Sequence, residues 1–155
     1  MGRYEDLLIQ NSHLHICDTF ELPGMFKGFY DNGVILIDKN LSDAKKLEIL
    51  SEELAHHEIT YGNILDDKNM QNRKYKLKAR RLAFEMLIGL DDLVRAHSEG
   101  IKNAYELSEF FEVTEQFTKD CLKHYQAKYG NEVKHDNYLI TFEPLNIIDI
   151  RRCKK

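Results

Sequence analysis

The chain has 155 residues, a length that fits one domain with a sizeable core. Hydrophobic residues make up 43% of it and charged residues 31%, which is an ordinary globular composition. The net charge of −4 argues against a general nucleic-acid-binding protein, and no apolar run reaches the length of a membrane span. The three cysteines are scattered and form no C-x-x-C motif, which favours free thiols, so we expect a cytoplasmic protein.

The first quarter of the chain predicts a short helix followed by short strands. Residues 4–10 fit a helix, and residues 13–22 alternate loosely as a strand would. The segment 31–33, Asp-Asn-Gly, separates apolar runs at 28–30 and 34–37. It predicts a hairpin, because Asn and Gly tolerate positive φ.

A long helix is predicted after Ser42, which is the expected N-cap. Within this helix Glu52 and His56 are four residues apart, so they point the same way, and Glu53 follows the first of them. This is the layout of H-E-x-x-H, in which two zinc ligands at i and i+4 flank a general base. Here Glu replaces the first His.

Two other interpretations of this helix are open. The segment 57–61, His-Glu-Ile-Thr-Tyr, begins like the same motif one residue later, but it has Tyr in place of the second His. We prefer the first register, because a carboxylate and an imidazole at the ligand spacing are both good zinc donors. A solvated helix face that is rich in Glu and His explains the pattern without any metal.

The next predicted helix, residues 72–88, begins with a strongly basic stretch. A solvated face explains this stretch better than a docking patch for DNA or an acidic partner does. Residues 103–129 then resemble a helix-turn-helix pair, but its second helix begins nearly neutral to acidic, which disfavours direct binding of nucleic acid. Strands are expected at 138–142 and 146–150. Nothing divides the chain, so we expect a single α+β domain over residues 1–155.

Four stretches of the chain occur together in the order of one protein family. They are residues 27–37, 49–57, 78–88 and 105–114. With these stretches the chain resembles the ImmA/IrrE family of metallopeptidase-like proteins, in particular versions from phages and integrating elements of bacteria.

The resemblance implies a zincin-like fold, with a small, mostly antiparallel sheet packed on the active-site helix and a helical C-terminal half. An edge strand near the site would hold an extended substrate, and Phe29, Tyr30 and Val34 are the candidates on the predicted hairpin. The implied role is that of a phage or mobile-element protein in the bacterial cytoplasm. Such a protein cleaves or otherwise inactivates a partner repressor, which we expect to be a helix-turn-helix protein.

The resemblance also assigns site residues, and one position departs from the family. Glu52 and His56 match the two motif ligands of a zinc ion, and Glu53 matches the general base. The acidic third ligand of the family, on the next helix, falls on Lys76. A protonated lysine has no lone pair and repels a cation, so two protein ligands remain where catalytic zinc normally has three.

Two accounts of the departure are open. In the first, the protein is a zinc peptidase whose third ligand comes from elsewhere. The candidates are Asp66, Asp67, His57 and Asn72. In the second, the ammonium of Lys76 stands where zinc would be and pairs with Glu52 or Glu53, because a partly buried carboxylate pair needs a cation. The protein is then a module that binds a repressor without hydrolysis.

Overall fold

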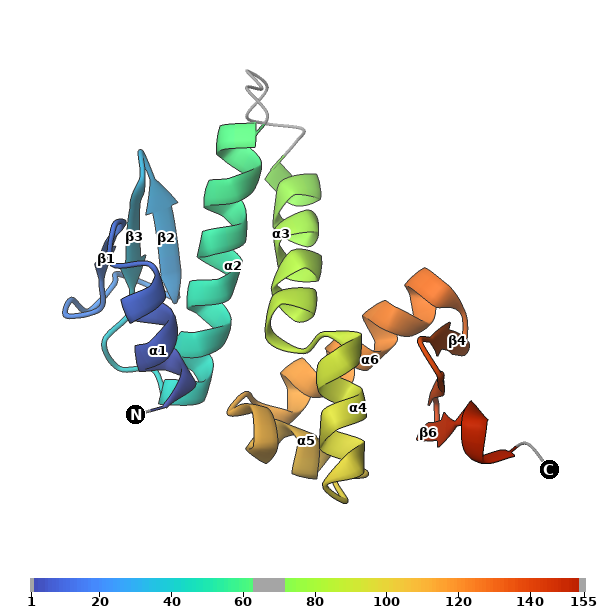
Figure 1. Cartoon of the computed structure of the whole chain (residues 1–155). Coiled ribbons are helices and arrows are strands. Elements are labelled where there is room, and N and C mark those ends of the chain that lie inside the picture. Colours follow the sequence, from blue (N-terminus) through green and yellow to red (C-terminus); the bar gives the residue numbers. More distant parts are fainter. Residues whose placement is uncertain (1, 63–71, 154–155) are drawn as a thin grey trace. The chain divides into compact units, whose positions relative to one another are not determined.

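The computed structural model describes residues 2–62 and 72–153 (Figure 1). The chain divides into two compact units, Met1–Met86 (unit 1) and Leu87–Lys155 (unit 2), and each is described by itself. Both units combine helices with a small sheet, so the predicted α+β class is confirmed. That residues 1–155 form a single domain stays a prediction. In the described residues, no helix has the length and apolar character that crossing a membrane requires.

Unit 1 is built from a three-stranded sheet and helices. Its elements are α1 (Arg3–Gln10), β1 (His15–Cys17), β2 (Gly28–Asp31), β3 (Val34–Ile37), α2 (Asp43–Gly62) and α3 (Asn72–Leu87). The strand order is β1-β3-β2, with β1 parallel and β2 antiparallel to β3. The strand β2 is therefore at an edge of this sheet.

The β2–β3 hairpin forms where the sequence predicts it. Asn32 and Gly33 both have positive φ, 51° and 81°, as a two-residue hairpin turn requires. In the register, Tyr30 pairs with Ile35, and Phe29 pairs with Leu36. Since Ile35 is fully buried, this register places Tyr30 on the covered face of the sheet and Phe29 on the other face.

The helix α2 is the central element of unit 1. Ser42 Oγ caps its start by accepting a hydrogen bond from the Lys45 N–H at 3.2 Å, as predicted. Figure 1 shows the sheet on one side of α2 and α3 alongside it. A Cβ on Gly28 would lie 2.3 Å from Ile49 Cγ2, so β2 and α2 approach closely because residue 28 is glycine.

The contact between α2 and α3 is apolar. Ala55 and Ile59 of α2 form a buried cluster with Ala79 of α3, and the ring of Tyr75 packs against it. The small side chains at residues 55 and 79 allow the two helices to come close, which brings the polar residues of both helices within reach of one another.

Unit 2 combines helices with an antiparallel sheet. Its elements are α4 (Leu90–Ser98), α5 (Ala104–Phe111), α6 (Glu115–Tyr129), β4 (Glu132–His135), β5 (Tyr138–Phe142), β6 (Leu145–Asp149) and the 3-10 turn η1 (Ile150–Cys153). The strand order is β4-β5-β6. The ring of Tyr125 on α6 stacks on Phe142 at 5.7 Å, and its hydroxyl donates to the Ile88 carbonyl at 2.7 Å. Both strands expected here are present, and β4 is an additional strand that was not predicted.

Candidate functional site

The predicted site residues Glu52, Glu53 and His56 lie on α2, and α3 supplies a cation to them. Arg80 Nη1 donates a hydrogen bond to Glu52 Oε1 at 2.6 Å. Burial raises the pKa of Glu52, and the guanidinium of Arg80 lowers it by a smaller amount. The ion pair therefore offsets part of the desolvation of this carboxylate.

Glu53 is the most perturbed carboxyl group of the site. It is 9% exposed, and its Oε2 is buried without a hydrogen-bond partner in the part of the chain that the structure describes. His56 Nδ1 lies 4.0 Å from this oxygen. Burial and the charge of Glu52 raise the pKa of Glu53 to about 7, against the opposing charge of Lys76. A carboxyl group that titrates near neutral pH is suited to general acid–base chemistry.

The two histidines of α2 have different surroundings. Burial and the charge of Lys76 lower the pKa of His56, so its imidazole is neutral at pH 7 and keeps a lone pair for a ligand. His57 Nδ1 instead lies 3.0 Å from the Tyr30 hydroxyl, and the two rings meet edge to face. This contact links His57 on α2 to the strand β2.

Lys76 is exposed, and its charge acts on both Glu53 and His56. Contact with Glu52 is made by Arg80, one helical turn further along α3. The positions of Lys76 and Arg80 place two positive charges beside the predicted motif. Asp66 and Asp67, the predicted candidates for a further ligand, lie outside the described residues.

The three predicted substrate-binding residues do not share one face of the hairpin. Tyr30 faces α2 and contacts His57, whereas Phe29 and Val34 are on the opposite face and are 47% and 40% exposed. Tyr30 thus belongs to the surroundings of the candidate site. Phe29 and Val34 belong to an outer surface of the sheet.

An exposed apolar group precedes and includes the edge strand. The rings of Phe26 and Phe29 meet edge to face with centroids 6.1 Å apart, and both rings are exposed. Met25 is 95% exposed and Phe20 is 62% exposed. Exposed apolar side chains beside a free strand edge are typical of a surface that binds another chain.

The donor set of the described residues does not fit a catalytic zinc ion. Of the two predicted ligands, Glu52 already binds the guanidinium of Arg80 through its Oε1. Lys76, the residue that the resemblance aligns with the third ligand, has no lone pair when protonated, and the charges of both Arg80 and Lys76 repel a divalent cation. Three protein ligands are the usual minimum for catalytic zinc.

Sequence analysis did not single out two residues of this region, Arg80 and Tyr75. Arg80 is four residues after Lys76, so the helical repeat would have placed a second cation on the same side of α3. The ring of Tyr75 packs against the cluster between α2 and α3, and its hydroxyl is buried without a hydrogen-bond partner among the described residues. No sequence signal indicates that this hydroxyl is unsatisfied.

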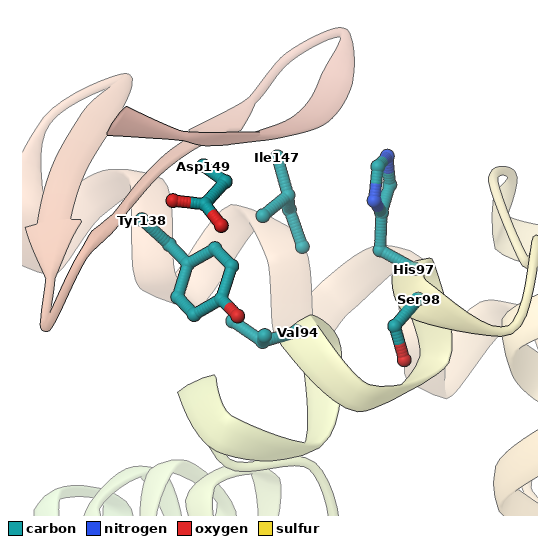
Figure 2. A pocket seen from close by; sticks show the side chains of 6 residues that line it. All are labelled: Val94, His97, Ser98, Tyr138, Ile147 and Asp149. Atoms are coloured by element: carbon teal, nitrogen blue, oxygen red, sulfur yellow. The ribbon is translucent and has the colours of Figure 1, made fainter. Parts of the chain in front are cut away.

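Unit 2 contains a separate pocket of about 300 Å³. Figure 2 shows His97 and Ser98 projecting from α4, and Tyr138 and Asp149 coming from the sheet. The Asp149 carboxylate accepts hydrogen bonds from the Arg151 side chain at 3.1 and 3.2 Å. This carboxylate therefore already binds a neighbouring side chain. The residues that line the pocket include none of the predicted site residues.

Comparisons with known proteins address the fold and the family. The family model of the IrrE N-terminal-like domain, peptidase family M78, matches residues 10–123. A solved structure named "Mycobacterium tuberculosis transcriptional regulator" is similar with a TM-score of 0.59 and 15% sequence identity, over 78% of this chain and 40% of that chain. The chain thus corresponds to less than half of that regulator. A search of curated proteins finds no match. Because the family model covers well over half of the sequence, the chain belongs to the IrrE N-terminal-like (ImmA/IrrE) family.

Proposed function

We propose that this chain inactivates a transcriptional repressor of the phage or mobile element that encodes it, and that it does so by binding without hydrolysis. Family membership and the similarity to a protein named a transcriptional regulator support a role in regulation. The observation that carries the non-hydrolytic part is the ion pair between Arg80 and Glu52.

The ion pair favours binding over hydrolysis because it occupies the first ligand position with a cation of the chain itself. A zinc ion at Glu52 would have to share the carboxylate with the guanidinium of Arg80 and would lie close to two positive side chains. The guanidinium already offsets part of the desolvation cost of this carboxylate, so the folded protein depends less on a metal there.

The binding surface that we propose is the outer edge of β2, which pairs only with β3 among the described strands, together with the exposed aromatic residues beside it. An extended segment of the repressor would add to this edge as a further strand, with main-chain hydrogen bonds, while Phe26 and Phe29 contact its side chains. A shift of β2 on binding would move Tyr30, and the contact between Tyr30 and His57 would pass this movement to α2.

We also propose that the fold is zincin-like and that residues 1–155 act as one domain in the bacterial cytoplasm, where a repressor works. The packing of α2 on a small sheet, with α3 alongside, supports the zincin-like assignment. In unit 2, α5 and α6 are joined by a short turn, as in a helix-turn-helix pair. The first turn of α6 carries the acidic Glu115, which favours a protein partner over DNA.

The test is to incubate the purified chain with the repressor of the same element, with zinc added, and to record native and denaturing mass spectra. We expect a complex in which both chains have their intact masses, together with loss of operator binding by the repressor. Phe29→Ser should weaken the complex at least tenfold. Ile148→Ser, a similarly exposed apolar position in unit 2, is the matched control and should not. A cleaved repressor, or equal effects of both variants, would overturn the proposal.

A second candidate function, a zinc-dependent endopeptidase that cleaves the repressor, is favoured by Glu53. Its buried Oε2 lacks a partner, and its pKa near 7 suits a general base. This function needs a further ligand from outside the described residues. It predicts cleavage of the repressor that is abolished in Glu53→Gln and restored in the wild type by zinc after chelation. Cleavage that persists in Glu53→Gln would exclude it.

A further inference from the structure

Unit 2 brings three metal-ligating side chains together far from α2 in the sequence. Asp91 is in the first turn of α4, His135 ends β4, and Asp136 is in the turn between β4 and β5. One ligand atom from each lies within 4.8 Å of the other two. We propose that Asp91, His135 and Asp136 form a site for a divalent transition-metal ion.

The distances within the cluster fit a shared ion. His135 Nε2 lies 2.6 Å from Asp91 Oδ1 and 3.8 Å from Asp136 Oδ2. Two ligands with bonds of about 2.0–2.1 Å to one zinc ion, at a tetrahedral angle, are about 3.3 Å apart. One observed separation is shorter than this value and the other is longer, so small rotations of the two carboxylates bring all three atoms to one ion.

The ligand types select the class of ion. An imidazole nitrogen with two carboxylate oxygens suits Zn²⁺, Co²⁺, Ni²⁺ or Mn²⁺, whereas Ca²⁺ and Mg²⁺ prefer all-oxygen sites. Two carboxylates and a neutral imidazole together carry the charge that neutralises a divalent ion. Both carboxylates are largely exposed, 84% for Asp91 and 74% for Asp136, so water can complete the coordination at little cost in desolvation.

A bound ion would join elements that are distant in the sequence. Asp91 and His135 are separated by 44 positions, and they connect the start of α4 with the β4–β5 hairpin. Without an ion these two residues form a hydrogen-bonded pair, in which Asp136 stays 3.8 Å from the imidazole. The part played by Asp136 therefore distinguishes a metal site from a simple ion pair.

The experiment titrates the full chain with Zn²⁺ and Co²⁺ by calorimetry and by the absorbance of bound Co²⁺. Asp136→Asn should weaken one binding event at least tenfold and should remove the rise in melting temperature that Zn²⁺ causes in the wild type. Asn tolerates the positive φ of 53° at this position, so the turn is kept. The matched control is Glu132→Gln, an exposed carboxylate on the same hairpin, which should bind as the wild type does.

Any zinc bound near α2 is common to both variants and cancels in the comparison. A second measurement follows the His135 ring by NMR, where Zn²⁺ should shift its resonances in the wild type and in Glu132→Gln but not in Asp136→Asn. Three results would overturn the proposal. They are equal Zn²⁺ affinities of Asp136→Asn and Glu132→Gln, a His135 signal that Zn²⁺ does not shift in the wild type, and Mg²⁺ binding as tight as Zn²⁺ binding. These outcomes are independent of the function proposed for α2 and β2.

Discussion

Arg80 and Glu52 form an ion pair of 2.6 Å between α3 and α2, so the carboxylate at the first position of a zinc motif is bound to a cation of the chain itself. In one of the two accounts that the sequence left open, Lys76 was to pair with Glu52 or Glu53. The guanidinium of Arg80, one helical turn beyond Lys76, contacts Glu52 instead. Lys76 is exposed, and its charge lowers the pKa of Glu53 and of His56.

Replacing Arg80 by Gln should lower the free energy of unfolding by about 1–2 kcal/mol, because it leaves a half-buried Glu52 without its cation. Chemical unfolding in urea measures the change. Arg81→Gln, at the exposed neighbouring position, should change the free energy by less than about 0.5 kcal/mol. Arg80 also lies over the ring of Phe84, so the ion pair is isolated by repeating Arg80→Gln in a Glu52→Gln background. If Arg80→Gln lowers the free energy of unfolding as much in the Glu52→Gln background as in the wild type, the ion pair is not the cause of the loss.

Glu53 should make the stability depend on pH with a defined sign. Its pKa is raised in the folded state, from 4.5 to about 7, so the folded protein favours the protonated form. The contribution to stability is fully present below pH 4.5 and is lost as the pH rises through 7. Glu53→Gln should therefore match the wild type at pH 4 and exceed its free energy of unfolding by about 3 kcal/mol at pH 8.

The measurement for Glu53 is a series of urea unfolding curves from pH 4 to pH 8 on both proteins. Because only the difference between the two curves is used, the titration of groups that do not contact Glu53 cancels. The matched control Glu58→Gln removes an exposed carboxylate from the same helix and should change the free energy by less than about 0.5 kcal/mol. A difference for Glu53→Gln that does not grow with pH would count against the raised pKa.

Gly28→Ala should destabilise unit 1 by about 1–3 kcal/mol, because the added methyl group meets Ile49 Cγ2 at 2.3 Å. The strand β2 or the helix α2 then has to move. Thermal and urea unfolding of the full chain report the loss. The double variant Gly28→Ala/Ile49→Ala should lose less stability than the sum of the two single variants, since the cavity at residue 49 accepts the methyl group. If the losses of the two single variants simply add in the double variant, the contact with Ile49 is not the cause of the destabilisation.

Tyr30→Phe should cost about 1 kcal/mol and should alter the environment of His57, because it removes the hydroxyl 3.0 Å from His57 Nδ1. The histidine signals in an NMR spectrum and the urea midpoint are the measurements. Tyr105→Phe also removes a hydroxyl hydrogen bond, to Glu109 at 2.8 Å, but on an exposed helix, and should cost less than about 0.5 kcal/mol. Unchanged His57 resonances in Tyr30→Phe would rule out the coupling of β2 to α2.

Local chemistry explains which parts of the fold the sequence predicts well. The hairpin follows from Asn32 and Gly33, whose positive φ is a property of the two residues themselves. The start of α2 follows from Ser42, whose hydroxyl meets a backbone N–H three residues away. These features depend on neighbours in the sequence, and both lie within residues 10–123, which the family model matches.

The features that were missed depend on how elements pack. The strand β4 has the sequence Glu-Val-Lys-His, too short and too charged to show an apolar alternation, and it is a strand because β5 pairs with it. The partner of Glu52 depends on how α3 packs against α2, where Ala55 and Ala79 belong to the buried cluster between the two helices. The spacing of residues along one helix determines their common side, but not which side chain of another helix meets them.

Position 28 has a mechanical consequence. With only hydrogen on its α-carbon, the strand rests against the helix without an intervening side chain, and a Cβ there would lie 3.5 Å from Glu53 Cγ. If a peptide adds to the outer strand, as we propose, a shift of that strand toward the helix would meet the turn that bears Glu53.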